Sequence, residues 1–429
     1  MMSTNDIAIR SSIFHFLSEE KYEFFEDGLL VLIDGLVQEM GDAKELLKRW
    51  EGIIPIRDER GKLLMPGFID GHIHAVQNGI LASYSDNLLD WLDHYTFPYE
   101  MHFQNVSFCE NDIKEFYRQL LSNGTTSAAI YSSVHPQSLT QIMEESLKLN
   151  MRIIAGKTNM DRNAPDELLE ETSSTYATHS AFIEKYHQHK RLNYALTPRF
   201  AITSSKQQLE ALALLKKNYP KIHVQTHISE NDNEIQSVKE LFPERKDYLD
   251  VYEHYGLVAE NTLLGHGIHL SDSEWQRVKA SGASLVHCPT SNLFLGSGLF
   301  KLKKCFEMKI PVALGSDVGG GTSFSMLKTA AAAYHVASLQ GYKPSALKMF
   351  FLLGLGGAQA LGIGHKVGNF ELGKEGDFIL IDTKSLPLLK NRLEKTKNIE
   401  EILFALMMLG DDRNIDAVYL MGKRLNIEN

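Results

Sequence analysis

The chain has 429 residues, of which 43% are hydrophobic and 23% are charged. This composition is typical of a folded globular protein, so extensive disorder is excluded, and the length suffices for one large α/β barrel with a smaller second domain. The 44 Lys and Arg residues against 54 Asp and Glu residues give a net charge of −10, which argues against a nucleic acid or an anionic membrane surface as the partner.

The cysteines and the N-terminal segment indicate the compartment. Cys109, Cys288 and Cys305 are too few and too irregularly spaced for a disulfide framework, and they favour a reducing environment. The N-terminal segment carries acidic residues between positions 19 and 27 instead of a basic stretch before an apolar one, so no signal or transit peptide is expected. The most apolar stretch, 349–364, is shorter than the roughly 20 residues of a membrane span and predicts a buried helix with its turns. We therefore expect a cytoplasmic protein that does not bind membranes.

The two ends of the chain share a pattern of short alternating segments. Residues 28–33 and 52–57 alternate in hydrophobicity as short antiparallel strands do. Residues 376–382 and 417–424 have the same pattern, the last with a Met421-Gly422-Lys423 turn. We expect residues 1–66 and 366–429 to combine into one small composite β-sandwich domain that the central region interrupts.

In the central region, a short β-rich run that ends in polar or glycine residues is repeatedly followed by a helix-like segment. The runs cover residues 63–74, 125–133, 152–161, 192–200, 222–230, 262–270, 284–292 and 311–319. Helical patterns lie between them, for example at 111–122, 206–218 and 272–281. Eight strand–helix units predict a closed α/β barrel of the (β/α)₈ TIM type over residues 67–365. An open doubly wound sheet is less favoured, because no G-x-G-x-x-G turn follows the first strand.

Polar residues that can bind a metal stand at the ends of these runs. His72 and His74 close the first run, and residues i and i+2 of a strand face the same side, so both imidazoles can reach one ion. An isolated H-x-H is a weak signal in a chain with 17 histidines. Its position favours a metal site, because barrel active sites are built at the C-terminal ends of the strands.

The fifth run ends in Thr226-His227-Ile228-Ser229-Glu230. Glu230 falls in the loop over the barrel mouth, where a carboxylate beside a metal-bound water can transfer protons. The alternative interpretation is that Glu230 caps or solvates the next helix. His223, lower in the same strand, is interpreted as a core histidine.

Two further residues complete the candidate mouth. His266, flanked by glycines in the sixth run, is a ligand, an electrophilic hydrogen-bond donor or a structural residue; His269 is interpreted as structural. Asp317 closes the eighth run, where a carboxylate after a buried strand needs a partner or a cation. Strand eight adjoins strand one in a closed barrel, and three imidazoles with one carboxylate suit Zn²⁺ completed by water.

The pattern Pro66-Gly67-Phe68-Ile69-Asp70-Gly71-His72-Ile73-His74, followed by His227, His266 and Asp317, resembles the amidohydrolase superfamily. Within it, the chain is most similar to the branch that hydrolyses guanine to xanthine and ammonia. The segments that carry this resemblance are 88–92, 95–98, 197–200, 227–231, 291–293, 323–327 and 410–414. One departure is visible: Val76 stands where mammalian relatives carry Ser, which bears only on fine substrate preference.

The resemblance implies a barrel with a composite β-sandwich, a homodimer, and one Zn²⁺ per chain that activates the water attacking C2 of guanine. It implies the metal ligands His72, His74, His227 and Asp317. It implies catalytic roles for Glu230, His266 and Asp317. It implies that the base is bound by Gln77, Arg199 and Phe200, together with His227, Glu230, His266 and Asp317.

The residue types fit the chemistry of guanine deamination. Glu230 can take the water proton and pass it to the ring and then to the departing amine. The planar fork of Arg199 matches the O6 and N7 edge of guanine. Gln77 offers both a donor and an acceptor, and Phe200 a stacking face. For Arg199 the alternative is a surface ion pair.

Trp91 and Phe97 have a structural alternative, packing within their loop, which is favoured for Phe97.

Other functions also remain open. A second mononuclear amidohydrolase could deaminate or dehalogenate a different heterocycle, and Arg199 and Gln77 are the residues that distinguish it. A binuclear amidase would need a bridging lysine, but residues 192–204 contain none and only Lys157 on the third strand remains.

A barrel scaffold protein without catalysis would be expected to lack the metal ligands. The zinc-deaminase design with H-x-E and P-C-x-x-C is not met, since no second cysteine follows His287-Cys288-Pro289 at the required spacing.

Overall fold

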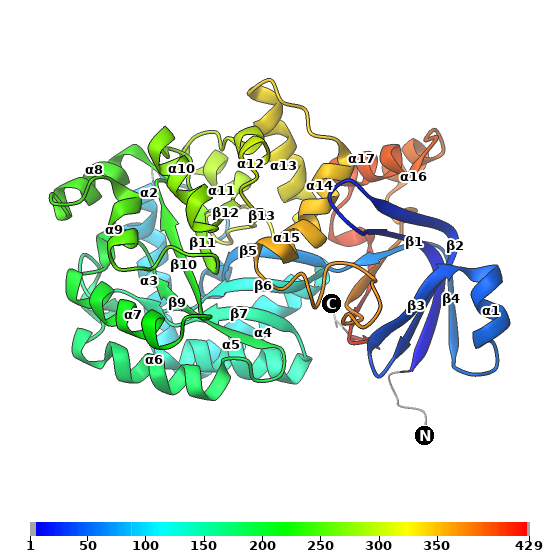
Figure 1. Cartoon of the computed structure of the whole chain (residues 1–429), viewed down its shortest axis with the longest axis horizontal. Helices are drawn as coiled ribbons and strands as arrows, with labels where there is room; N and C mark the ends of the chain where they lie inside the picture. Colours follow the sequence, from blue (N-terminus) through cyan, green and yellow to red (C-terminus); the bar gives the residue numbers. More distant parts are fainter. Residues whose placement is uncertain (1–5, 87, 427–429) are drawn as a thin grey trace.

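The computed structural model describes residues 6–86 and 88–426. Within them, eight parallel strands form a nearly closed barrel, on the left of Figure 1. The strands are β5 (Phe68–His74), β6 (Thr125–Tyr131), β7 (Arg152–Gly156), β9 (Leu192–Pro198), β10 (His223–Ile228), β11 (Thr262–His266), β12 (Ser284–His287) and β13 (Val312–Leu314); the two-residue β8 (Thr158–Asn159) pairs with β9.

Two backbone hydrogen bonds join the first barrel strand to the segment that follows the last one. The Asp317 amide donates to the His72 carbonyl oxygen at 2.8 Å, and the His74 amide donates to the Val318 carbonyl oxygen at 2.9 Å. They bring Asp317 beside the two histidines at the C-terminal edge of the barrel, which is the edge where barrel active sites form.

Helices cover the barrel and its mouth. Those around the barrel and over its loops are α2 (Leu88–Trp91), α3 (Phe97–Met101), α4 (Val106–Ser122), α5 (Pro136–Leu149), α6 (Thr172–Tyr186), α7 (Lys206–Asn218), α8 (Asp232–Leu241), α9 (Tyr248–His254), α10 (Asp272–Ser281), α11 (Pro289–Phe294), α12 (Leu302–Met308), α13 (Met326–Leu339), α14 (Ala346–Leu353) and α15 (Leu355–Ala360). The helices predicted at 206–218 and 272–281 have these bounds, because Ser205 and Ser271 cap their first turns through their hydroxyl oxygens.

A second sheet is built from both ends of the chain, on the right of Figure 1. Its seven strands within the described residues are, in spatial order, β16 (Lys423–Arg424), β15 (Ile415–Leu420), β14 (Phe378–Ile381), β4 (Ile56–Pro66), β1 (Ile7–Phe16), β2 (Tyr22–Ile33) and β3 (Leu36–Asp42). The antiparallel pairing of β14 with β4 joins the two chain ends, and α1 (Ala43–Trp50) packs on β2 and β3. The predicted fold class, a barrel with a β-domain from both ends, is confirmed.

Several predicted strands have different limits in the structure. The short antiparallel strand expected at 52–57 is wrong, because residues 51–53 form the turn after α1, and only Ile56 and Arg57 belong to a strand, β4, where they pair in parallel with β1. The run 63–74 is divided: β4 ends at Pro66 in the second sheet, and β5 begins at Phe68 in the barrel. Gly67 lies between them against β6, where an added Cβ would be 2.1 Å from Thr126 Oγ1. The run 284–292 stops at His287, because Pro289 opens α11, a position that proline favours.

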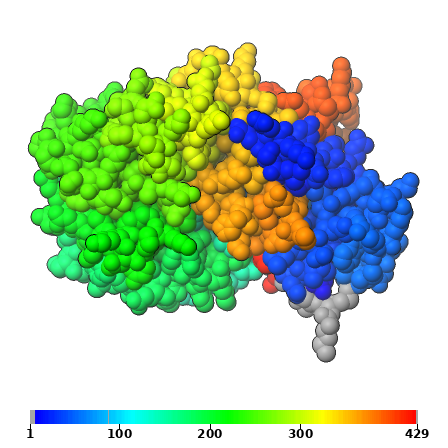
Figure 2. Space-filling model, viewed as in Figure 1, coloured from blue at the N-terminus to red at the C-terminus, as the bar shows by residue number. Residues whose placement is uncertain are grey.

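The expected domain limits at residues 66 and 366 stay a prediction. Beyond the second limit, α16 (Pro387–Leu393) precedes α17 (Ile399–Leu409), and α17 packs against α13 and α14. The space-filling view shows the orange segment that includes α15 wedged between the green barrel and the blue sheet (Figure 2).

No helix among the described residues combines the length and apolarity that crossing a membrane requires.

A buried ionic cluster links the barrel to the second sheet. Glu375, just before β14, accepts hydrogen bonds from Nε of Arg152 at 2.6 Å and from Nε of Arg191 at 3.0 Å. Arg191 also pairs with Asp377. All four residues are less than 10% exposed, so each charge depends on its partners.

Candidate functional site

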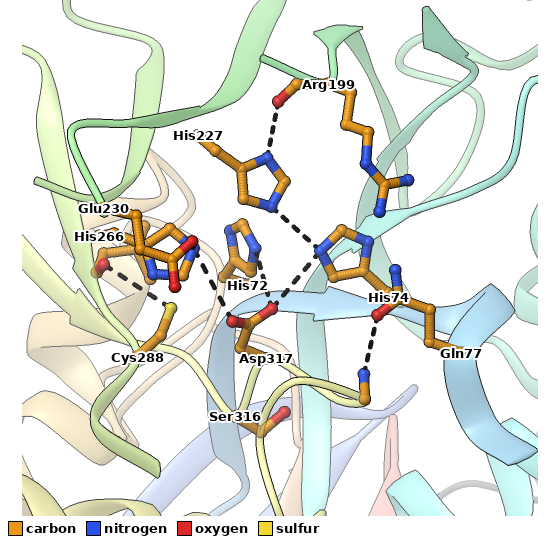
Figure 3. Close-up of polar contacts among 12 residues, drawn as sticks. His72, His74, Gln77, Arg199, His227, Glu230, His266, Cys288, Ser316 and Asp317 are labelled. Atoms are coloured by element: carbon orange, nitrogen blue, oxygen red, sulfur yellow. Dashed lines mark hydrogen bonds and ion pairs between the residues drawn. The ribbon is translucent and has the colours of Figure 1, made fainter. Parts of the chain in front are cut away.

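Four side chains from three separate segments converge at the barrel mouth. His72 and His74 come from the end of β5, His227 from the end of β10, and Asp317 follows β13. One ligand atom of each lies within 4.8 Å of those of the other three. The Nε2 atoms of His74 and His227 are 3.2 Å apart, and Asp317 Oδ1 lies 3.3 Å from Nε2 of His72 and 3.5 Å from Nε2 of His74 (Figure 3).

These four groups fit a metal ion. Nε2 of His72 is buried and has no hydrogen-bond partner among the described residues. Burial, reinforced by the neighbouring histidines, holds the pKa values of His74 and His227 well below their ordinary value, so both rings are neutral. Burial alone would raise the pKa of Asp317, but the adjacent His72 and His266 bring it below its ordinary value. Neutral imidazoles with one carboxylate form a ligand set suited to Zn²⁺.

The backbone shapes the space around His72. A Cβ on Gly265 would lie 2.8 Å from His72 Cε1, and a Cβ on Gly315 would lie 2.8 Å from His72 Cβ. Asp317 and His266 both have positive φ angles, 52° and 69°, which are strained for residues other than glycine. Such strain clusters at functional sites, where the surrounding packing holds it.

Glu230 lies beside this cluster and is buried. Its Oε1 accepts hydrogen bonds from Ser297 Oγ at 2.9 Å and from Asn292 Nδ2 at 3.4 Å, and its Oε2 lies 3.4 Å from His266 Nε2. Burial, together with the Asp317 and Glu234 carboxylates, raises the pKa of Glu230 well above its ordinary value, as proton transfer near neutral pH requires. The capping alternative is wrong, since the N-cap of α8 is Asn231 and its capping-box partner is Glu234.

His266 is held as a hydrogen-bond donor. Asn292 Nδ2 donates to its Nδ1 at 2.8 Å, which leaves the proton of the neutral ring on Nε2. Burial lowers the pKa of His266 to about 4, so the ring is neutral at pH 7. Its Nε2 lies 3.8 Å from Asp317 Oδ2 and has no hydrogen-bond partner among the described residues.

A pocket of about 430 Å³ opens onto these groups. In Figure 3, Arg199 and Gln77 lie on one side of the imidazole cluster, and Glu230 and His266 lie on the other. The lining comprises His74, Gln77, Leu88, Trp91, Leu92, Arg199, Phe200, His227, Glu230, Glu234, His266, Ser291, Leu295, Asp317 and Gly320. The site residues expected from the sequence therefore face one cavity, apart from His72, which is not among the lining residues.

Arg199 and Gln77 share a partner that the sequence analysis missed. Nη1 of Arg199 donates to both carboxylate oxygens of Glu100, at 2.8 and 2.9 Å, and Nε2 of Gln77 donates to Oε1 at 2.8 Å. Arg199 is 3% exposed, so the surface ion-pair alternative is excluded by burial. Ser297 was missed in the same way, and Asn292 was noted only as part of the resembling segment 291–293, without a role, because only the folded loops bring the two residues to Glu230.

The aromatic residues near the mouth have different positions. Phe200 and Trp91 line the pocket, while Phe97 is buried behind it, with the Arg199 guanidinium carbon 5.7 Å from its ring centroid. Phe97 belongs to the apolar cluster of its loop, as its structural interpretation predicts. Val76 is fully buried beside Gln77.

Of the remaining alternatives, Lys157, His223 and His287 lie outside the pocket lining. Nζ of Lys157 pairs with Glu170, so it has its own counter-ion and does not line the pocket. His223 contacts the Leu361 carbonyl oxygen at 3.1 Å, and His287 stacks on Phe300. Cys288 lies close to His72, His266 and Asp317, and burial raises the pKa of its thiol well above the ordinary value.

Comparison with known proteins identifies the family to which the chain is related. Residues 63–425 match the amidohydrolase family. The guanine deaminase of Escherichia coli is 44% identical over 400 residues, covering 93% of this chain and 91% of that protein. Its solved structure superposes with a TM-score of 0.95, covering 99% and 100% of the two chains at 42% identity. The guanine deaminase of C. acetobutylicum, solved with guanine in its active site, superposes with a TM-score of 0.91 at 31% identity, covering 98% and 100% of the two chains.

Proposed function

The chain belongs to the amidohydrolase family, and we propose that it hydrolyses guanine to xanthine and ammonia. The observation that carries this proposal is the arrangement of the pocket, with Arg199 and Gln77 on one side of the His and Asp cluster and Glu230 and His266 on the other. A planar base that places its O6 and N7 edge at Arg199 would present its amine end to the cluster and Glu230. The guanine deaminases among the relatives support the same assignment.

His72, His74, His227 and Asp317 would hold a single Zn²⁺ ion. When bound, the metal lowers the pKa of a coordinated water and thereby makes it a nucleophile at neutral pH. Neutral His74 and His227 rings and an ionised Asp317 need no proton loss before they bind a cation, which supports this ligand set.

Glu230 is the proton carrier in this proposal. Its carboxylate takes one proton from the attacking water and delivers it to the ring nitrogen beside C2. It then carries the second proton, from the hydroxyl now bonded to C2, to the amine, so that the bond between C2 and the amine breaks, ammonia leaves and the oxygen becomes the new carbonyl. Ser297 and Asn292 bind one carboxylate oxygen, which leaves the second oxygen to face His266 and the pocket. The raised pKa of Glu230 makes the protonated form accessible during turnover.

His266 and Asp317 orient the attacking water. The Nε2–H group of His266 lies between Glu230 Oε2 and Asp317 Oδ2, at 3.4 and 3.8 Å. From there it can donate to the water oxygen, because Asn292 occupies the other ring nitrogen. A neutral donor of this kind stabilises the negative charge on the water oxygen as it gives up its proton.

Arg199, Gln77, Phe200 and Trp91 would bind the base. The free donors of Arg199 match the O6 and N7 acceptors of guanine, and the apolar side chains that line the pocket cover the faces of the ring. Adenine lacks O6 and offers a donor at that position, so it would place an N–H group against the guanidinium and bind poorly.

The family likeness also supports a homodimer in the cytoplasm. Sedimentation equilibrium of the purified protein tests the oligomer directly, and a monomer at micromolar concentration would contradict that part of the proposal.

The function is tested with a deaminase assay on guanine, adenine, cytosine and 8-oxoguanine, with metal content measured on the same sample. We expect close to one zinc per chain and guanine as the preferred substrate. A protein that holds zinc and prefers another of these bases would overturn the substrate, while a protein that holds no metal and deaminates none would overturn the reaction.

A further inference from the structure

We propose that Glu100 is a positioning residue that orients Arg199 and Gln77 together and cancels the charge of the guanidinium, so that the pocket selects a neutral purine over an anionic one. The inference rests on the proposed function, because Arg199 and Gln77 are the residues assigned to base recognition there. Glu100 lies in α3, in the loop region between β5 and β6, far in sequence from Arg199.

One carboxylate serves both base-binding side chains. Arg199 Nη1 donates to the two oxygens of Glu100 at 2.8 and 2.9 Å, and Gln77 Nε2 donates to Oε1 at 2.8 Å. Three charge-assisted hydrogen bonds to a single group fix the relative position of the two donors. A shift of Glu100 would therefore move both at once.

The contacts leave free the groups that a base needs. Only Nη1 of Arg199 is used, and Nε and Nη2 have no hydrogen-bond partner among the described residues. The Phe97 ring, 5.7 Å from the guanidinium carbon, limits tilting of the fork. Gln77 is held at its other end too, since its Oε1 accepts from the Gly319 amide at 3.1 Å, and one N–H of its amide remains.

The ion pair of Glu100 and Arg199 is buried away from solvent and from other carboxylates among the described residues. Glu100 is 0% and Arg199 3% exposed, and Glu100 is the only carboxylate that pairs with Arg199 within residues 6–86 and 88–426. Removing the carboxylate charge would leave an uncompensated buried cation. With Glu100 present, this side of the pocket is neutral overall and presents hydrogen-bond donors without a net positive charge.

Neutrality matters because substrate and product differ in acidity. Guanine is uncharged at neutral pH, whereas xanthine carries a second carbonyl in place of the amine and loses a ring proton more readily. An unbalanced guanidinium would attract the xanthine anion and slow its release. Glu100 removes that attraction while leaving the directional donors that recognise O6 and N7.

The test is a double-mutant cycle of Glu100→Gln and Arg199→Gln, read as kcat and KM for guanine with metal content measured throughout. Glu100→Gln alone should raise KM at least tenfold, with a smaller change in kcat and unchanged zinc. In the Arg199→Gln background the same change should raise KM less than about threefold, because a residue that acts through its partner is not additive with it. If Glu100→Gln raises KM by the same factor with and without Arg199, the proposal is overturned.

The charge component has its own measurement, the ratio of the xanthine inhibition constant to KM for guanine. Glu100→Gln should lower this ratio at least tenfold, whereas Glu100→Asp, which moves the carboxylate but keeps its charge, should raise KM and leave the ratio within about twofold. A ratio that is unchanged in Glu100→Gln would contradict the role in charge selection.

Glu375→Gln is the matched control, because Glu375 is likewise a buried carboxylate bound by arginines but lies in the link between the two sheets. Its KM for guanine and its ratio of the xanthine inhibition constant to KM should equal those of the parent. If Glu375→Gln changes them as much as Glu100→Gln does, the effect is a general destabilisation and the proposal is overturned. If Glu100→Gln does not fold, the double variant is compared with Arg199→Gln: equal KM supports the proposal, and a further tenfold rise contradicts it.

Failure of this inference is distinct from failure of the proposed function. If the parent protein does not deaminate guanine, the proposed function is overturned. If the parent deaminates guanine but the effects of Glu100→Gln and Arg199→Gln on KM are additive, only the role of Glu100 is overturned.

Discussion

The Nδ1 atom of His227 lies 2.6 Å from the backbone carbonyl oxygen of Arg199. His227 ends β10 and Arg199 follows the neighbouring β9, so a candidate metal ligand is oriented by the backbone of a candidate base-binding residue. The bond fixes the proton on Nδ1 and leaves Nε2 for the metal. Because the link uses the carbonyl and not the guanidinium, the two functions of this residue can be separated by mutation.

Arg199→Lys should therefore impair the base pocket without disturbing the metal site. The variant keeps a positive charge and the backbone carbonyl but loses the planar fork. We expect kcat/KM for guanine to fall about tenfold or more, which corresponds to about 1.4 kcal/mol or more. Zinc content should equal that of the parent. Parent-like activity would place Arg199 outside the site, and loss of zinc would show that the side chain itself supports His227.

His227→Ala should remove most of the bound zinc. Only three of the four proposed ligands would remain, and the two imidazoles of β5 could not complete the coordination with Asp317 alone. Metal analysis after gel filtration measures the effect. His223→Gln, a substitution at the opposite end of the same strand, serves as the control and should keep its zinc. Full metal content and activity in His227→Ala would contradict the ligand assignment.

Glu230→Gln should abolish most turnover while leaving stability near that of the parent. The amide keeps the shape of the side chain but cannot carry the proton, and general acid–base catalysis contributes about 10²–10⁴-fold. We expect a loss of kcat toward the upper end of that range, with zinc retained.

Asn231→Ala is the matched control for Glu230→Gln, because Asn231 and not Glu230 caps α8. It should lower the stability by about 1 kcal/mol and keep much of the turnover. Thermal melts and kcat measured on both variants distinguish the roles: a Glu230→Gln protein with parent-like turnover and a lowered Tm would show that the carboxylate is structural.

The stability of the fold should depend on pH through His223. Burial lowers the pKa of His223 to about 4, below the ordinary value of 6.5, so between these pH values the unfolded chain binds a proton that the folded chain excludes. The free energy of unfolding should thus fall as the pH is lowered from about 6.5 to about 4 and lose no more from this group below that. In His223→Gln, which can still donate to the Leu361 carbonyl, the decline over this interval should be smaller. Identical pH profiles in urea titrations of the two proteins would contradict this.

Arg191→Met should destabilise the link between the barrel and the second sheet. It leaves Asp377 without its arginine partner and Glu375 with Arg152 alone. Breaking a buried ion pair from one side costs about 3–5 kcal/mol, which denaturant unfolding would report. Since the cluster lies outside the pocket lining, KM for guanine should be unchanged in the folded fraction, and a parent-like midpoint would show that the cluster contributes little.

Local patterns were sufficient to predict the barrel and to bring the candidate metal ligands to one edge of it. Strand parity puts His72 and His74 on one side of β5, and the repeated order of strand and helix places His227, His266 and Asp317 at the same edge. Both signals depend only on neighbours within an element and on the direction of parallel strands, so both can be recognised in a single amino-acid sequence. The division of residues 63–74 between two sheets was not, since it depends on strand pairings with distant segments: β4 pairs with β1 and β14, and β5 pairs with β6.

The tertiary structure alone decided which polar groups support the site. Glu100 contacts Gln77 and Arg199, which are 23 and 99 positions away, and Ser297 reaches Glu230 across 67 positions. Nothing in the residues around Glu100 indicates a buried carboxylate, because a short helix with an acidic residue is equally typical of an exposed loop. The pairing of buried charges depends on which loops meet over the barrel mouth, and that is set by long-range packing rather than by the periodicity of any one element.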